Sequence, residues 1–158
     1  MEFYTIGVYN STKEEYFKKL SNNNIDTFCD VRQRRGVRGA KYSFVNSNRL
    51  QGTLNEMEIK YAHILELSPT NEIRDQQKLD DERNKEQKRD RKQLGQIFKV
   101  MYQNNILKKF EFEYLFEMLE QVAASKIVFF CVEEHHKACH RSLITNQLEK
   151  LGYDITHL

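Results

Sequence analysis

The stretch KIVFFCV, residues 126–132, is the most informative part of the sequence about the fold. After Lys126 it is an unbroken apolar run with no alternation between apolar and polar positions. Such a run is typical of a strand that is covered on both faces, as in a parallel sheet. Beyond it the chain turns polar, and apolar residues then recur at helical spacing until Gly152. The stretch therefore predicts a buried strand that leads through a polar turn into a helix.

The rest of the chain alternates between similar runs and helical patterns. The other runs that read as strands are FYTIGVY (3–9), IDTFCDV (25–31), YAHIL (61–65) and YDITHL (153–158). The helical patterns cover residues 11–20, 46–57, 110–124 and 142–151. We therefore predict an α/β fold: a three-layer, open, mainly parallel sheet of about five strands flanked by helices, Rossmann-like or flavodoxin-like.

Composition excludes several classes of protein. A chain of 158 residues fits a single domain, 1–158, and the formal net charge of +2 does not by itself indicate a polyanionic partner. The first residues lack the features of a signal peptide, and no apolar run approaches the roughly 20 residues that cross a bilayer. The cysteines, Cys29, Cys131 and Cys139, are odd in number. We expect a cytoplasmic protein with reduced thiols and no membrane association.

One segment, 70–93, does not fit the alternation of strands and helices. It contains NEIRDQQKLDDERNKEQKRDRK, a run of good helix formers dominated by charges of both signs. We predict a charged helical insertion. Two interpretations stay open: a solvated helix or mobile loop, or a lid or nucleic-acid-binding arm over a site elsewhere.

Polar residues follow the predicted strands at their carboxyl ends. Asp30 and Arg32 close the second strand, Glu133 follows the fourth, and Tyr61 and His63 lie on the third. Open parallel sheets bind ligands beyond the carboxyl ends of their strands. We therefore expect these side chains to gather at one site.

A basic loop, 32–42, follows Asp30 and contains no acidic residue. Its cationic side chains are Arg32, Arg34, Arg35, Arg38 and Lys41. Arginines on a glycine-containing loop suit phosphate groups, because the guanidinium fork matches two oxygens at once. Tyr42 and Phe44 come next and are candidates for stacking on a base. The alternative is a solvated basic loop without a ligand.

Cys139 lies at the expected start of the last helix, within CVEEHHKACHRSLI (131–144). The helix dipole and its free amides, together with His140 and Arg141, favour a thiolate at this position. Cys139 is therefore a candidate nucleophile, with Glu133 or a histidine to move protons. Two alternatives stay open: an anion held by the helix amides and Arg141, or a purely structural turn.

The same stretch is dense in residues that bind zinc, namely Cys131, His135, His136, Cys139 and His140. However, their spacing matches neither a paired CxxC nor HExxH, and Cys131 belongs to the predicted apolar strand. Zinc is therefore the less favoured interpretation. We predict no metal ligand and no cofactor.

Five short motifs resemble those of the domain of unknown function 488 family. They are TIG (5–7), DVR (30–32), YAH (61–63), CVE (131–133) and CHR (139–141). The resemblance runs from the first strand to His157 and implies an α/β fold with these motifs at one edge. It implies no activity, because the family is named for lacking one.

This chain departs from the family pattern after three of the strands. Val8-Tyr9 stand where the family usually has His-Ser, and Gln33-Arg34-Arg35 stand where a proline and serine often follow DVR. Residues 66–69 replace a glycine-rich turn. The first departure affects any role that needs a histidine beside the first strand.

Two classes of function follow from these patterns. The first is a hydrolase or transferase that acts on a phosphorylated nucleotide or nucleic acid. Its predicted catalytic residues are Cys139, Glu133, Asp30 and His140. Its predicted substrate-binding residues are Arg32, Arg34, Arg35, Arg38, Arg141, Tyr61 and His63. The alternative is a non-catalytic nucleic-acid-binding module or a small Cys/His metal-binding protein.

Overall fold

A parallel sheet forms the centre of the computed structural model, which describes residues 1–158. Its strands are β1 (Glu2–Ile6), β2 (Thr27–Asp30), β3 (Lys60–His63), β4 (Lys126–Phe130) and β5 (Ile155–His157). All pair in parallel, in the order β3-β2-β4-β1-β5. The strand that begins at Lys126 is therefore the middle one, with β1 and β2 as its neighbours. The predicted fold class is confirmed.

The position of β4 gives the sheet its particular strand order. Dinucleotide-binding and flavodoxin-like sheets use the orders 3-2-1-4-5 and 2-1-3-4-5, in which β1 and β2 are adjacent. Here β4 lies between them. The connections that leave β1 and β2 run toward the β3 edge, whereas the connection that leaves β4 runs toward β5. The neighbouring strands β2 and β4 therefore send their connections in opposite directions, and such sheets bind ligands at the carboxyl ends of strands that diverge in this way.

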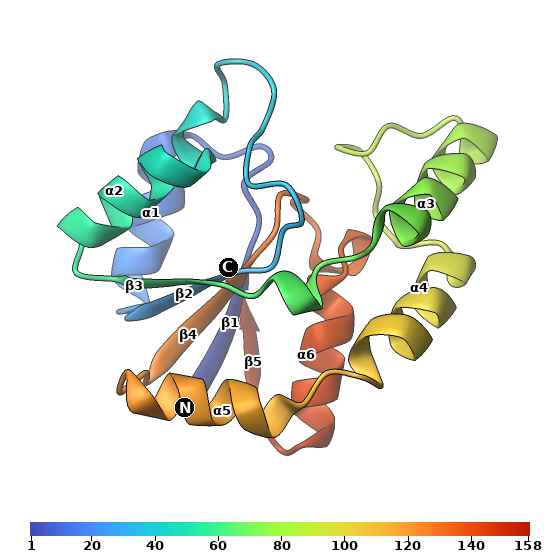
Figure 1. The fold of residues 1–158 in the computed structure, drawn as a ribbon. Coiled ribbons are helices and arrows are strands. Elements are labelled where there is room, and N and C mark those ends of the chain that lie inside the picture. Colours follow the sequence, from blue (N-terminus) through green and yellow to red (C-terminus); the bar gives the residue numbers. More distant parts are fainter.

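Helices cover both faces of the sheet (Figure 1). They are α1 (Lys13–Asn22), α2 (Ser47–Glu56), α3 (Asn71–Asn84), α4 (Gln96–Tyr102), α5 (Phe112–Gln121) and α6 (Arg141–Lys150). Helices α1 and α2 lie on one face, α5 and α6 on the other, and α3 and α4 pack on each other beside the sheet. Thr12 caps α1 through a capping box with Glu15. Helix α4 and the π-helical turn Gln103–Leu107 that continues it were not predicted.

Two neighbouring phenylalanines in β4 connect the three layers. Phe130 contacts Tyr16 of α1, with ring centroids 5.7 Å apart. Phe129 stacks on Phe3 of β1 at 6.0 Å, and Phe3 contacts Phe116 of α5 at 6.3 Å. Successive side chains of a strand point to opposite faces, so β4 is covered on both sides as its apolar run predicted. Truncating either buried ring to alanine would cost about 3–5 kcal/mol.

The predicted charged insertion is tied to the same core. Its first part is helix α3, and Ile73 of that helix belongs to the single buried cluster of 34 apolar residues. Leu94 and Phe98, which follow the insertion, belong to it too. The segment is therefore joined to the core at both of its ends. None of the helices of the structure combines the length and the apolar character needed to cross a membrane.

Candidate functional site

The ends of β1 and β4 approach each other closely. The backbone amides of Val8 and Tyr9 both donate to the carbonyl oxygen of Val132, at 3.1 and 3.0 Å. A Cβ added at Gly7 would overlap the carbonyl oxygen of Glu133 and lie 2.8 Å from its carbonyl carbon. Glycine is required at this position because any side chain would separate the two strand ends. This contact brings Tyr9 to the carboxyl end of β4.

The DVR motif forms a buried ion pair. Asp30 is 0% exposed and accepts from Arg32 Nε at 2.9 Å and from Arg32 Nη2 at 2.7 Å. The hydroxyl of Tyr61 donates to Asp30 Oδ2 at 2.9 Å, and His63 Nε2 donates to the carbonyl oxygen of Arg32 at 2.8 Å. Burial and the adjacent Asp30 carboxylate raise the pKa of Tyr61 to about 12. In this geometry Asp30, Tyr61 and His63 position Arg32.

Arg32 retains one unused donor. Its Nη1 atom is buried and has no hydrogen-bond partner, although the other guanidinium atoms serve Asp30 and the carbonyl oxygen of Val45. The guanidinium carbon lies 4.5 Å from the ring centroid of Phe130, a cation–π contact. Buried donors nearly always have an acceptor. An acceptor from outside the chain would satisfy the hydrogen-bonding capacity of Arg32 Nη1.

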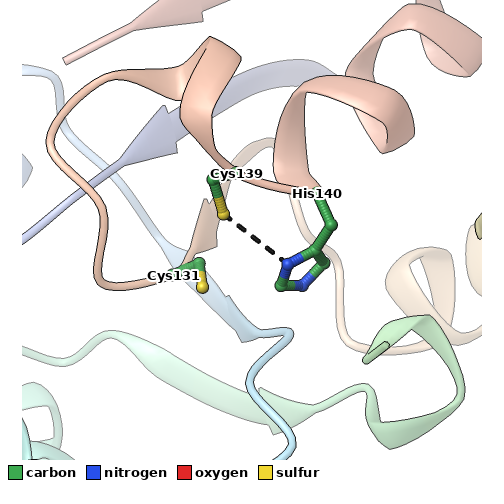
Figure 2. Close-up of side chains that lie close together, drawn as sticks. All are labelled: Cys131, Cys139 and His140. Carbon is green, nitrogen blue, oxygen red and sulfur yellow. Dashed lines mark hydrogen bonds between the residues drawn. The ribbon is translucent and has the colours of Figure 1, made fainter. Parts of the chain in front are cut away.

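Cys131, Cys139 and His140 form a second cluster of side chains (Figure 2). Their sulfur and ring nitrogen atoms all lie within 4.8 Å of one another, and Cys139 Sγ is 3.6 Å from His140 Nδ1. His140 Nε2 lies 2.9 Å from the carbonyl oxygen of Val31. A carbonyl only accepts, so Nε2 carries a proton and Nδ1 of the neutral ring is free to accept or to bind a metal.

The two thiols differ in their surroundings. The hydrogen bond with Cys139, together with burial, raises the pKa of Cys131 well above its ordinary value. Cys139 is 1% exposed and has extended backbone angles, and His140 is the N-cap of α6. Cys139 therefore precedes α6 by two residues.

The charged segment contributes a buried arginine that sequence reasoning did not single out. The side chain of Arg91 is 5% exposed, and its Nη1 atom donates to Asp81 Oδ2 at 2.7 Å. Its Nη2 atom lies 3.3 Å from Glu133 Oε1, and Nε and Nη2 donate to the carbonyl oxygen of Ala138 at 3.2 and 2.9 Å. Lys88 Nζ lies 3.4 Å from the same Glu133 oxygen. Residues 88–91 thus pack against the turn that follows β4.

Glu133 is held in its charged form by these cations. Burial alone would raise its pKa, but Lys88 and Arg91 lower the pKa to about 2. Its second oxygen, Oε2, accepts from Cys131 Sγ at 3.2 Å. A carboxylate with so low a pKa is a weak base. Its contribution at neutral pH is a fixed negative charge that anchors Lys88 and Arg91.

A cavity of about 850 Å³ opens at the carboxyl end of β4, between the basic loop and the charged segment. Its seven basic side chains are Arg32, Arg34, Arg38, Arg74, Lys78, Lys88 and Arg91. Its three carboxylates are Asp75, Asp81 and Glu133. Tyr9 and Tyr42 form an aromatic pair in its wall, with ring centroids 5.3 Å apart. The cavity therefore suits a ligand that is anionic and carries a flat ring.

The structure brings together about half of the predicted site residues. Those that line the cavity are Cys139, Glu133, His140, Arg32, Arg34 and Arg38. Those outside its lining are Asp30, Arg35, Arg141, Tyr61 and His63. Arg141 is 1% exposed and donates to the carbonyl oxygens of Cys131 and Glu134, at 3.4 and 2.8 Å. In this structure it holds the turn after β4.

Two further candidates for ligand contact are engaged elsewhere. Phe44 is half-buried and packs against Tyr16 and Phe17 of α1 at the edge of the core, with centroid distances of 5.7 and 6.0 Å. His136 stacks on His157, with ring centroids 3.6 Å apart. Burial and the neighbouring His157 lower the pKa of His136 to about 4. Of the zinc ligands that the sequence offered, only Cys131, Cys139 and His140 come together.

The structure is that of a three-layer α/β protein with a cavity at the carboxyl ends of its parallel strands. The cavity combines basic side chains with a Cys/His cluster.

Residues 12–148 match the family model described as Domain of unknown function DUF488, so the chain belongs to this family. This result confirms the resemblance carried by the DVR and CHR motifs. Comparison with curated proteins finds no match, and comparison with solved structures finds none.

Proposed function

We propose that this protein is an enzyme, a hydrolase or transferase, that acts on a phosphorylated nucleotide or nucleic-acid strand. The observation that carries the proposal is the cavity at the carboxyl end of β4. There, seven basic side chains face three carboxylates, and the Cys139–His140 pair lies in the same wall. Open α/β sheets bind their ligands at this place.

The basic side chains of the cavity divide into anchored and free cations. Arg32 and Arg91 are fixed by buried carboxylates, and Arg32 Nη1 still lacks an acceptor. Arg34 and Arg38 are exposed, and neither forms an ion pair within the chain. Phosphate oxygens would accept hydrogen bonds from the anchored and from the free arginines, because a guanidinium group binds phosphate through two parallel hydrogen bonds. The Tyr9–Tyr42 pair offers a ring face for a base.

Cys139 is the nucleophile in this proposal. His140 Nδ1, 3.6 Å from the sulfur, takes the thiol proton, and the carbonyl oxygen of Val31 holds the ring in the orientation that allows it. The sulfur forms a bond to the transferred group, and the leaving group departs with the proton from His140. Water or a second substrate then releases the group from sulfur. Glu133 stays charged and keeps Lys88 and Arg91 in the wall.

A turnover assay with pools of nucleotides and of nucleic acids tests the reaction. We expect Cys139→Ser to lower turnover by at least about 100-fold, the range reached when a catalytic group is removed. The matched control is Cys29→Ser, because Cys29 is equally buried but lies in β2, outside the cavity lining. Full activity of Cys139→Ser on a substrate that the wild type consumes would refute the assignment.

Binding of a fluorescent single-stranded oligonucleotide tests the substrate class separately. Each phosphate contact contributes about 0.7 to the slope of log affinity against log salt concentration. The double variant Arg34→Ala/Arg38→Ala should therefore reduce this slope by about 1.4. Arg49→Ala is the control, because Arg49 is exposed on α2 and does not line the cavity. Equal slopes in all three proteins would contradict the proposed binding surface.

The two experiments also separate the two classes of function. Salt-dependent binding without turnover, unaffected by Cys139→Ser, would favour a non-catalytic nucleic-acid-binding module. The exposed arginines of the basic loop would then account for the whole function.

A further inference from the structure

We propose that Cys131, Cys139 and His140 bind one soft divalent cation, Zn²⁺, at the wall of the cavity. The inference goes beyond the proposed function, because it concerns the affinity of these side chains for a metal and needs no substrate. Two thiolates and one imidazole are a donor set that zinc prefers over the oxygen-binding metals.

The distances between the donor atoms fit a tetrahedral ion. Bond lengths of about 2.3 Å to sulfur and about 2.0 Å to nitrogen place the two donors about 3.5 Å apart at the tetrahedral angle. Cys139 Sγ and His140 Nδ1 are 3.6 Å apart, and Cys131 Sγ lies within 4.8 Å of both atoms. Figure 2 shows Cys139 directed at the ring of His140, with Cys131 close to both. Small side-chain rotations would bring all three donors onto one ion.

The surroundings of His140 are those of a metal-binding histidine. Its Nε2–H donates to the carbonyl oxygen of Val31 at 2.9 Å. Histidine ligands typically donate their second ring nitrogen to a carbonyl or carboxylate, which fixes the tautomer and orients the first nitrogen. The bond therefore directs the free Nδ1 lone pair at the two sulfur atoms. The fold provides this orientation in the absence of any ligand.

Charge and access are also compatible with an ion at this position. Two thiolates balance the double positive charge, so the buried centre would be electrically neutral. Glu133 Oε2 lies 3.2 Å from Cys131 Sγ, next to one of the donors. All three donor residues line the cavity, so the cavity gives a fourth ligand access to the ion. Zinc sites with three protein ligands keep such a position open for water or substrate.

The metal and the substrate compete for the Cys139 sulfur. Zn²⁺ withdraws electron density from a bound thiolate, which is then a weaker nucleophile than the free thiolate. Zinc should therefore protect both cysteines of the site from alkylation and suppress any reaction that depends on the Cys139 thiolate.

Metal titration of the reduced, metal-free protein tests the site. In the presence of a phosphine reductant, Co²⁺ should give thiolate-to-metal charge-transfer absorption and the intense visible bands of a tetrahedral complex, saturating at one ion per chain. Zn²⁺ should abolish these bands by displacement. Removing even an outer partner of a metal ligand weakens affinity on the order of 10–100-fold. We therefore expect Cys131→Ser and His140→Gln each to weaken binding by more than about 100-fold.

Cys29→Ser is again the matched control and should bind Co²⁺ as the wild type does, because Cys29 is not part of the cluster. Alkylation with iodoacetamide, mapped by mass spectrometry, provides a second measurement that does not require the variants to fold. Zn²⁺ should slow the labelling of Cys131 and Cys139 in the wild type.

Three results would overturn the metal site. They are the absence of a tetrahedral Co²⁺ spectrum, alkylation of Cys131 and Cys139 at the same rate with and without Zn²⁺, and a disulfide between Cys131 and Cys139 that persists in the reductant. None of these measurements involves turnover. Failure of the metal site is therefore distinguishable from failure of the proposed reaction.

Discussion

Replacing Arg91 by alanine removes the one buried cation that ties the charged segment to the turn after β4. The variant leaves Glu133 with Lys88 as its remaining ion-pair partner and removes two donors from the carbonyl oxygen of Ala138. It also leaves Asp81 without its partner at 2.7 Å. The variant tests whether the contacts of Arg91 with Glu133, Asp81 and Ala138 stabilise the position of the charged segment 70–93.

The structure sets the expected size of the effect. Removing one partner of a buried ion pair typically costs about 3–5 kcal/mol, because the other charge stays buried and unpaired. Asp81 loses its ion-pair partner, whereas Glu133 keeps Lys88, so the lower end of this range applies. The whole lowering of the pKa of Glu133 from 4.5 to about 2, which Lys88 and Arg91 produce together, corresponds to about 3 kcal/mol. We therefore expect Arg91→Ala to lower the free energy of unfolding by about 3 kcal/mol.

The loss should depend on pH with a definite sign. The folded-state pKa of Glu133 lies below its unfolded value, so its contribution is fully present above pH 4.5 and is lost as the pH falls toward 2. In Arg91→Ala the pKa of Glu133 rises, because one of the cations that lower it is gone. The stability difference between wild type and variant should therefore narrow as the pH falls below 4.5.

Urea unfolding followed by circular dichroism, at neutral pH and in acid, measures both effects. The matched control is Arg89→Ala, two residues away, because the Arg89 side chain is 70% exposed and pairs only with Asp90. Exposed ion pairs contribute about 0–1 kcal/mol, so this variant should change stability little. Equal losses in the two variants, or a difference that does not narrow in acid, would refute the claim that Arg91 anchors the segment.

Two other substitutions test the framework of the site by the same unfolding measurement. Gly7→Ala should destabilise by about 1–3 kcal/mol or prevent folding, because its Cβ would overlap the carbonyl oxygen of Glu133. The control is Gly52→Ala, in α2 with open space around it, which should instead stabilise by up to about 1 kcal/mol. A change in the free energy of unfolding of the same sign in both variants would contradict this account. Tyr61→Phe should cost about 1.5–3 kcal/mol, because its hydroxyl donates to the buried Asp30 carboxylate. An unchanged unfolding midpoint would show that the hydrogen bond does not support the ion pair.

Local sequence pattern determined the fold class and the edge of the sheet at which the site lies. The apolar run of β4 required cover on both faces, and Phe129 and Phe130 do pack against opposite layers. The strands could be placed because burial on both faces imposes an apolar run that is visible without knowledge of any partner. The carboxyl ends of parallel strands share one edge, so the proximity of Cys139 and His140 to the end of the DVR motif could also be predicted.

Tertiary structure alone decided which charged residues belong to the site. Arg89 and Arg91 lie in the same polar run, yet one is exposed and the other is buried against Glu133, 42 residues away in the sequence. Likewise, His140 is directed at the two sulfur atoms, whereas the nearby His136 stacks on His157. Long-range packing decides which partner a charged or polar side chain has. This choice produces no periodic pattern in the sequence, so it cannot be predicted from the sequence as strands and helices can. The sequence therefore determined where a site would lie, and the position of β4 between β1 and β2 decided which side chains form it.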